Sequence, residues 1–248
     1  HETINDLDHG VMNLFTVLRD QPEEFMRLAE LTIHSRELWR ECREKWATEE
    51  DPVRKAWRWW VVAVTGWGAT WGSAWGTGTT AVDAGLMRQC YSLARRLRHL
   101  PAIMARLYGT QIECAPALRV LERYCTPDSL AYCDPPYVSE TRRAGEYTEE
   151  FTDADHEALI ALLLRLPGRF LLSGYDHPIY APLEAAGWGR VDWEVDASSA
   201  CRTRASGLQG PGSCAHQRRT ETLWLDPATA AEKLPALQQA LALDSVAG

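Results

Sequence analysis

The chain lacks the sequence features of exported and membrane-spanning proteins. None of its 248 residues lies in an apolar run near the ~18 residues that a membrane-spanning helix needs. The first residues, His1-Glu-Thr-Ile-Asn-Asp, contain neither the basic nor the apolar region of a signal peptide. We therefore expect a cytoplasmic protein, in a bacterial or phage-infected cell, that has no membrane partner.

Cysteines with the spacing of a metal or redox site are also missing. The seven cysteines are odd in number and scattered, and no two of them form a Cys-x-x-Cys pair. Neither a disulfide framework nor a zinc site is therefore indicated. We expect reduced, mostly buried thiols and no bound metal.

The chain has a net charge of −8, which does not suggest a nucleic-acid-binding protein until the charge is mapped. Residues 53–110 carry eight basic side chains and one acid, a local net charge of +7. The local field is what a polyanion meets. An Arg-rich, solvated helix face at 88–98 would give the same pattern.

Short apolar runs that end at turn signals alternate with amphipathic segments over most of the chain. Strands are expected at residues 2–6, 110–114, 130–134, 169–174, 190–195 and 220–225. Helices are expected at 8–18, from Pro22, around 118–124, around 159–164 and near the C-terminus, and a charged stretch, Arg40 to Pro52, leads out of the first unit. Repeated strand–helix units indicate an α/β fold with a mostly parallel sheet and helices on both faces.

Residues 53–106 differ in character and are predicted to form a mostly helical insertion. Five glycines between residues 66 and 78 indicate a loop, and residues 86–108 show a helical pattern that Pro101 divides. The loop also contains Trp67 and Trp71. Tryptophans there can pack as a small core, or can contact phosphates and unstacked bases beside the basic residues.

The tetrapeptide Asp134-Pro135-Pro136-Tyr137 closes the apolar run at 130–133. In open α/β sheets, ligands bind just outside the carboxyl ends of such strands. The Asp134 carboxylate and the Pro135 carbonyl can accept the two N–H bonds of an exocyclic amine, which turns the nitrogen lone pair toward an electrophilic methyl. Tyr137 can stack on an extruded base. A proline-stiffened turn capped by aspartate is the structural alternative.

Together with this tetrapeptide, the ordered segments Ile4-Asn-Asp-Leu-Asp, Ile112-Glu-Cys, Phe170-Leu-Leu-Ser-Gly-Tyr and Arg219-Thr-Glu-Thr-Leu-Trp-Leu resemble those of the Dam-type N6-adenine DNA methyltransferases of bacteria and phages. The resemblance implies a Rossmann-like sheet that binds S-adenosylmethionine, and methylation of adenine N6 in double-stranded DNA after base flipping, as in restriction–modification. It also implies a catalytic domain at 1–52 and 107–248, and a target-recognition insertion at 53–106.

The resemblance also assigns roles to residues. Asp6 would bind the ribose of S-adenosylmethionine, although it could instead cap the helix at 8–18. The other residues implied to bind the cofactor are Ile112, Glu113, Cys114 and Asp134, and those implied to be catalytic are Asp134, Pro135, Pro136 and Tyr137. The predicted DNA contacts are Arg54, Lys55, Arg58, Trp67, Trp71, Arg88, Arg95, Arg96 and Arg142.

Two departures from the family pattern matter. Pro116 stands where the family usually has an acid that contacts the cofactor. The strand and Gly-rich turn that begin such enzymes are not in this chain, and we expect roughly 40 to 60 further residues upstream, enough for a strand–loop–helix unit. The alternatives are a cofactor-deficient nucleic-acid-binding protein and an amino-methyltransferase acting on cytosine N4.

Overall fold

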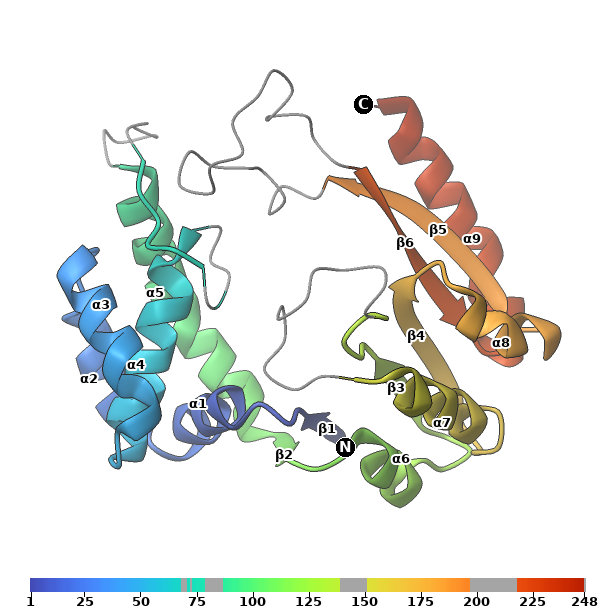
Figure 1. Ribbon diagram of the computed structural model, residues 1–248, viewed down its shortest axis with the longest axis horizontal. Helices are drawn as coiled ribbons and strands as arrows, with labels where there is room; N and C mark the ends of the chain where they lie inside the picture. The colour runs from blue at the N-terminus through green and yellow to red at the C-terminus, as the bar shows by residue number, and fades with distance from the viewer. Residues whose placement is uncertain (68–70, 72, 79–86, 139–150, 197–217, 248) are drawn as a thin grey trace. The chain divides into compact units, whose positions relative to one another are not determined.

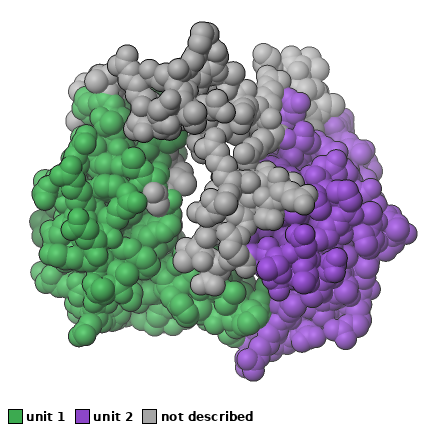
Figure 2. Space-filling model, viewed as in Figure 1, with its two compact units in different colours: residues 1–117 green, residues 118–248 purple. Residues whose placement is uncertain are grey.

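The chain folds into two compact units, residues 1–117 and residues 118–248 (Figure 2). The computed structural model describes residues 1–67, 71, 73–78, 87–138, 151–196 and 218–247. None of the helices in these ranges is both long enough and apolar enough to cross a membrane.

Unit 1 combines a group of helices with a two-stranded parallel sheet (Figure 1). Its elements are β1 (Glu2–Asn5), α1 (His9–Asp20), α2 (Pro22–Glu30), α3 (Arg36–Lys45), the 3₁₀ turn η1 (Trp46–Thr48), α4 (Pro52–Thr65), α5 (Arg88–Tyr108) and β2 (Thr110–Glu113). The predicted strands at 2–6 and 110–114 and the predicted first two helices are confirmed.

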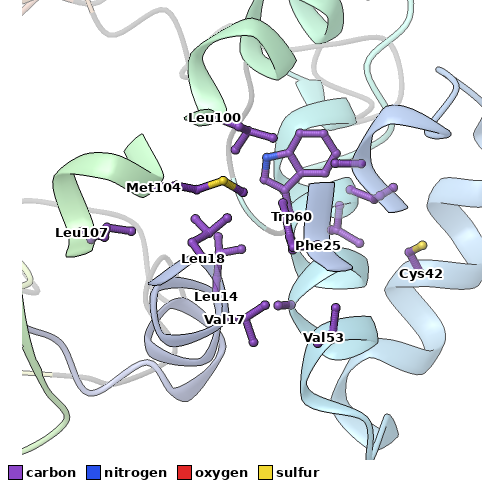
Figure 3. Packing of buried hydrophobic residues seen from close by; sticks show 14 of the residues in the cluster. Leu14, Val17, Leu18, Phe25, Cys42, Val53, Trp60, Leu100, Met104 and Leu107 are labelled. Carbon is purple, nitrogen blue, oxygen red and sulfur yellow. The ribbon is translucent and has the colours of Figure 1, made fainter. Parts of the chain in front are cut away.

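One hydrophobic core holds the helices of unit 1 together (Figure 3). Leu14, Val17 and Leu18 lie on one face of α1, at the spacing that a 3.6-residue period requires. They share the core with Trp60 of α4 and with Leu100 of α5, among others. The core therefore joins helices on both sides of the domain boundary predicted at residue 52. A division by function at that boundary stays a prediction.

Helix α5 runs through Pro101 without interruption, so the prediction that this proline divides the helix is wrong. Proline removes one backbone donor and crowds the preceding turn, which disfavours a helix interior. On α5, however, the apolar face continues across the proline and is buried in the unit 1 core. It contains Leu93 and Leu100 before Pro101, and Met104 and Leu107 after it. Burial of one continuous apolar face offsets the local cost.

Helix α3 occupies the start of the charged stretch that the sequence predicts to lead out of the first unit. Ser35 caps it by accepting a hydrogen bond from the Leu38 amide at 3.4 Å. Trp39 and Cys42, three residues apart, are buried, and Cys42 belongs to the unit 1 core. Trp39 and Cys42, with the partly buried Leu38, thus dock a helix whose other positions are charged.

Unit 2 contains a four-stranded sheet with helices around it. Its elements are α6 (Ala117–Tyr124, which begins at the unit boundary), β3 (Leu130–Cys133), α7 (Asp153–Leu163), β4 (Arg169–Tyr175), the 3₁₀ turn η5 (Pro178–Tyr180), α8 (Ala181–Ala185), β5 (Gly189–Asp196), β6 (Arg218–Leu225) and α9 (Pro227–Ala247). The predicted strands and helices of this half are confirmed. Thr152 and Asp155 form a capping box at the start of α7.

The strand order in unit 2 is β3-β4-β6-β5. β3 and β4 pair in parallel, whereas β6 runs antiparallel to both β4 and β5. The expectation of a mostly parallel sheet is therefore incomplete, because one strand is reversed. Helix α7 lies between β3 and β4 in the chain, which agrees with their parallel pairing, because parallel strands need a crossover connection.

Both faces of the unit 2 sheet are covered, as predicted. On one face Phe170, Leu172 and Trp224 pack with residues of α7 and α8. On the other face Leu225 and Val191 pack against Ala230 of α9, the helix that follows β6 (Figure 1). Successive residues of a strand point to opposite faces, so each strand contributes to both cores.

Asp226 joins the end of β6 to two other elements. Its carboxylate accepts hydrogen bonds from the amides of Ala228 and Thr229 at 3.0 and 3.1 Å, in the first turn of α9, and from the amide of Phe170 at 2.9 Å, in β4. Burial raises the pKa of Asp226, but the hydrogen bonds outweigh burial and the net pKa is lowered. The ionised form is therefore the one that the fold stabilises.

We expect Asp226→Asn to destabilise unit 2 by about 1–3 kcal/mol. The side-chain NH₂ group of asparagine would face a backbone N–H donor and could not accept its hydrogen bond. In the unsubstituted chain the contribution of Asp226 is present above its unfolded pKa of about 4 and is lost as the pH falls through the lower folded value. Urea unfolding between pH 3 and pH 7 measures both effects. A variant that keeps the full acid dependence would contradict this role for Asp226.

Candidate active site and nucleic-acid interface

The tetrapeptide lies where the sequence predicts it, directly after β3. β3 ends at Cys133, Asp134 is exposed, and Pro135, Pro136 and Tyr137 are half-buried. Val138, the next residue, is 1% exposed and belongs to the unit 2 core. The tetrapeptide is thus held at both ends, by a strand before it and by a buried side chain after it.

Ser173 of β4 holds the carboxylate of Asp134. Its hydroxyl donates to Asp134 Oδ1 at 2.6 Å and lies 3.3 Å from the Cys133 carbonyl oxygen. Ser173 is itself 4% exposed, so its rotamer is confined by packing. The parallel register pairs Cys133 with Leu172, which puts the residues that follow each of them side by side. Among the described residues, no side chain donates a hydrogen bond to the second oxygen of this carboxylate.

A second contact at the same strand ends orients Tyr137. The rings of Tyr137 and Tyr175 are 4.5 Å apart at 74°, an edge-to-face arrangement. Tyr175 is the last residue of β4. Asp134 and Tyr137 are therefore each supported by a residue of the neighbouring strand β4.

Glu221 adds a second carboxyl group near Asp134. It lies on β6, opposite Tyr175 in the antiparallel register. Burial, and then the negative charge of Asp134, raises the pKa of Glu221. Glu221 is therefore easier to protonate than a carboxyl group in water.

His156 of α7 is buried beneath this region. It is 0% exposed, its Nδ1 lies 3.2 Å from the Tyr180 hydroxyl, and its ring packs edge-to-face on Phe151. Burial lowers the pKa of His156, against the opposing effects of Asp153 and of the Pro136 carbonyl. Burial therefore favours a neutral imidazole at this position.

In unit 1, the predicted cofactor residues gather at the carboxyl ends of β1 and β2. The register pairs Asn5 with Glu113, so Asp6 and Cys114 follow paired positions of the two strands. The side-chain amide of Asn5 donates to the Ala115 carbonyl oxygen and accepts from the Ala115 amide, both at 3.0 Å. This double hydrogen bond fixes the backbone just before Pro116.

Asp6 does not cap α1, so the structural alternative for this residue is wrong. Asp8 is the cap and accepts from the amides of Gly10 and Val11. Asp6 instead accepts a hydrogen bond from the Asp8 amide at 2.8 Å through Oδ1. The side chain is exposed, and its Oδ2 has no hydrogen-bond partner among the described residues.

Cys114 stands beside this carboxylate. Its Sγ lies 3.4 Å from His9 Nδ1. Burial, followed by the negative charges of Asp6 and Asp8, raises the pKa of Cys114, which keeps the thiol protonated and unreactive as a nucleophile. Ile112, on β2, is half-buried. The described residues contain no group of three or more His, Cys, Asp or Glu side chains placed to hold a metal ion.

The predicted DNA contacts come from several elements of unit 1. Arg54 and Lys55 lie in the first turn of α4, while Arg88, Arg95 and Arg96 lie on α5. Trp67, after α4, is 39% exposed. Arg142 lies outside the described residues.

Arg58 does not suit the predicted contact with DNA. Its side chain is 10% exposed and pairs with Glu49 at 3.0 Å and with Glu41 at 3.3 Å. Trp71 also has an internal partner: its ring stacks on Trp59 at 4.6 Å and packs edge-to-face on Trp46. Packing of this kind is what the small-core alternative predicts for the tryptophans, and the proposal below leaves Arg58 and Trp71 out.

The sequence prediction of the site did not include Ser173, Tyr175, Glu221 or His156. For Ser173 and Tyr175, the sequence does contain a signal that could have identified them. Ser173 and Tyr175 stand near the carboxyl end of a predicted strand, as Asp134 does, and strands that follow each other across a helix usually pair in parallel. Glu221 and His156 depend on the reversed strand and on helix packing, which no local pattern specifies.

Comparison with known families agrees with these features. The model of the D12 class N6 adenine-specific DNA methyltransferases matches residues 1–190, a range that includes β1, β2, the basic segment and the tetrapeptide. No curated protein matches the chain. The match covers more than half of the 248 residues. The chain therefore belongs to the D12 class N6 adenine-specific DNA methyltransferase family and is an enzyme of that class.

Proposed function

We propose that this enzyme transfers a methyl group from S-adenosylmethionine to N6 of an adenine flipped out of double-stranded DNA, on a Rossmann-like sheet. Asp134 and the Pro135 carbonyl accept the two amino hydrogens, and Tyr137 stacks on the base. Pro135 and Pro136 keep the backbone stiff. The observation that carries the proposal is the Ser173–Asp134 hydrogen bond of 2.6 Å, which directs an exposed carboxylate at a sheet edge.

A carboxylate fixed in this way does two things to an incoming amino group. It removes the need to order the acceptor during the reaction, and it places negative charge where the nitrogen becomes positive. Tyr175 holds the Tyr137 ring at 4.5 Å, so the surface that receives the base is also set in advance. The described residues thus supply positioning and electrostatics rather than a nucleophile.

The residues at the ends of β1 and β2 fit the cofactor that the family implies. The free Oδ2 of Asp6 suits a ribose hydroxyl, and the half-buried Ile112, with Glu113 and Cys114, would line the adenine. When bound, S-adenosylmethionine supplies the electrophilic methyl group. Pro116 offers no carboxylate to the cofactor, so Asp6 would be the main acidic contact in this unit.

Product analysis tests the proposal. Duplex DNA is incubated with the full chain and with methyl-labelled S-adenosylmethionine, and the nucleosides are then separated. We expect the label in N6-methyladenine. Label in N4-methylcytosine would replace the proposal with the amino-methyltransferase alternative. The absence of both label and a calorimetric binding isotherm for S-adenosylmethionine would favour the cofactor-deficient one.

We expect Ser173→Ala to lower kcat by roughly 10- to 100-fold with little change in the KM for DNA, because Asp134 loses the side-chain donor that it has among the described residues, whereas the proposed DNA contacts in unit 1 are unchanged. Ser173→Thr keeps a hydroxyl and should restore most of the rate. If Ser173 served packing alone, both variants would change the free energy of unfolding and leave kcat close to that of the unsubstituted enzyme.

A further inference from the structure

A cavity of about 440 Å³ opens between α4 and α5 in unit 1. Its apolar side is formed by Trp60 and Val64 of α4 and by Leu100 and Ile103 of α5. Its polar side comes entirely from α5, and consists of Ser92, Arg95, Arg96 and His99. Trp60 and Leu100 are also members of the unit 1 core (Figure 3), so the apolar side of the cavity is continuous with that core. We call it the α4–α5 pocket.

The positive charge in the pocket has no carboxylate partner within the part of the chain that the structure describes. Neither Arg95 nor Arg96 has a carboxylate within 4.0 Å among the described residues, although other arginines of unit 1, such as Arg58 and Arg106, do. Arg96 is half-buried, and burial, together with the neighbouring charge of Arg95, lowers its pKa. Partial burial of an unpaired cation beside a second cation costs free energy, which a bound anion would recover.

The orientation of Arg96 is fixed in advance. Its Nη1 donates to the Ser92 hydroxyl at 2.7 Å and to the Val64 carbonyl oxygen at 3.3 Å. Val64 lies in the last turn of α4, where carbonyl groups lack intrahelical partners. Capping α4 is therefore one function of this side chain. It uses only Nη1, however, and the Nε and Nη2 groups have no hydrogen-bond partner among the described residues.

The remaining donors match one kind of ligand. A guanidinium edge with free Nε–H and Nη2–H groups binds two oxygens of a phosphate side by side. Arg95 and His99, both exposed, add donors at the rim of the pocket. The apolar wall suits the carbon atoms of an attached sugar. A phosphate carrying a sugar is the chemistry that these surfaces complement.

We infer that the α4–α5 pocket is a phosphate-binding site that takes one backbone phosphate of the DNA substrate, with Arg96 as its anchor. This assignment rests on the proposed function, because it needs unit 1 to contact DNA. A free phosphate or phosphomonoester shares the same chemistry, and the experiment below separates the two sources.

The test uses the full chain with two probes. Inorganic phosphate is titrated at constant ionic strength while the Nε–H signals of the arginines are followed by NMR, and the Kd for duplex DNA is measured from 50 to 200 mM salt. The variants are Arg96→Gln and Arg95→Gln. Arg98→Gln is the matched control, because Arg98 is an exposed residue of α5 that does not line the pocket. Arg95→Gln also keeps the test valid if loss of Arg96 unfolds α4.

We expect a saturable phosphate-induced shift of the Arg96 signal that Arg98→Gln leaves unchanged. Loss of one phosphate contact should reduce the salt slope of log K by about 0.9 for Arg96→Gln. The ratio of unsubstituted to variant affinity then falls about threefold between 50 and 200 mM salt.

Two results would count against the assignment. A saturable shift without any slope difference from Arg98→Gln would overturn the DNA phosphate and leave a site for free phosphate. The absence of a saturable shift would overturn the site itself. Failure of the proposed function is distinguishable from both, because a chain that makes no N6-methyladenine would still show the phosphate response.

Discussion

Replacing Asp134 by alanine is expected to lower the rate of adenine methylation by at least roughly 10²–10³-fold, the usual effect of removing one fixed electrostatic contact to a reacting group. The side chain is exposed at the end of β3 and is held by Ser173 at 2.6 Å, so its loss removes an acceptor without opening a cavity. Transfer of tritium from labelled S-adenosylmethionine to duplex DNA measures the rate.

Asp128→Ala is the matched control, because Asp128 is an exposed aspartate in the turn that precedes β3. It carries the same charge and stands before the strand rather than after it, so its loss should leave the rate within about twofold. DNA binding should be close to that of the unsubstituted enzyme in both variants, since the predicted DNA contacts lie elsewhere. Activity that survives Asp134→Ala would rule out the mechanism proposed above.

The largest effect on stability is expected for Trp224→Ala, with a loss of about 3–5 kcal/mol from the free energy of unfolding of unit 2. Trp224 is 0% exposed, its ring lies 4.3 Å from that of Tyr180, and its Nε1 donates to Glu184 Oε1 at 3.2 Å. It also packs beside Gly174, where an added Cβ would lie 3.3 Å from its ring. Truncation therefore removes contacts to β4, to η5 and to α8 together.

Because the chain has two units, amide hydrogen exchange of β4 in urea is a better measurement than one global signal. Trp193→Ala, on the neighbouring strand β5, is the control: Trp193 is half-buried and packs at the edge of the core on the other face. Its loss should cost clearly less. Equal protection of β4 in both variants would show that Trp224 does not anchor this sheet.

Elements with strong local signals followed from the sequence. The apolar runs at 130–133 and 169–174 are specified by neighbouring residues, and both form strands as predicted. At Pro101, tertiary packing overrides the local preference of the residue. A helix-breaking residue is tolerated inside α5 because buried leucines on both sides of it hold the helix against the core, and that core includes residues nearly ninety positions away.

The residue types of the site were also readable from the sequence, and the contacts that support them were not. Asp134 and Tyr137 were recognised from the tetrapeptide and its place after a strand. The partners of these residues, Ser173 and Tyr175, became evident only from the register of β3 and β4. Arg58 shows the opposite case, because its positive charge in a basic segment predicts a DNA contact, whereas two carboxylates of the same unit hold it.

The sequence by itself determined the family, the strand that ends at Asp134 and the segregation of positive charge into residues 53–110. Each of these follows from the types and order of residues along the chain. Only the tertiary structure decided which of those charges are paired inside the fold, which side chain holds the Asp134 carboxylate and which arginines border a pocket. These properties depend on the distances in space between residues that are far apart in the chain. Burial and Coulomb energy are set by those distances and not by the order of the residues.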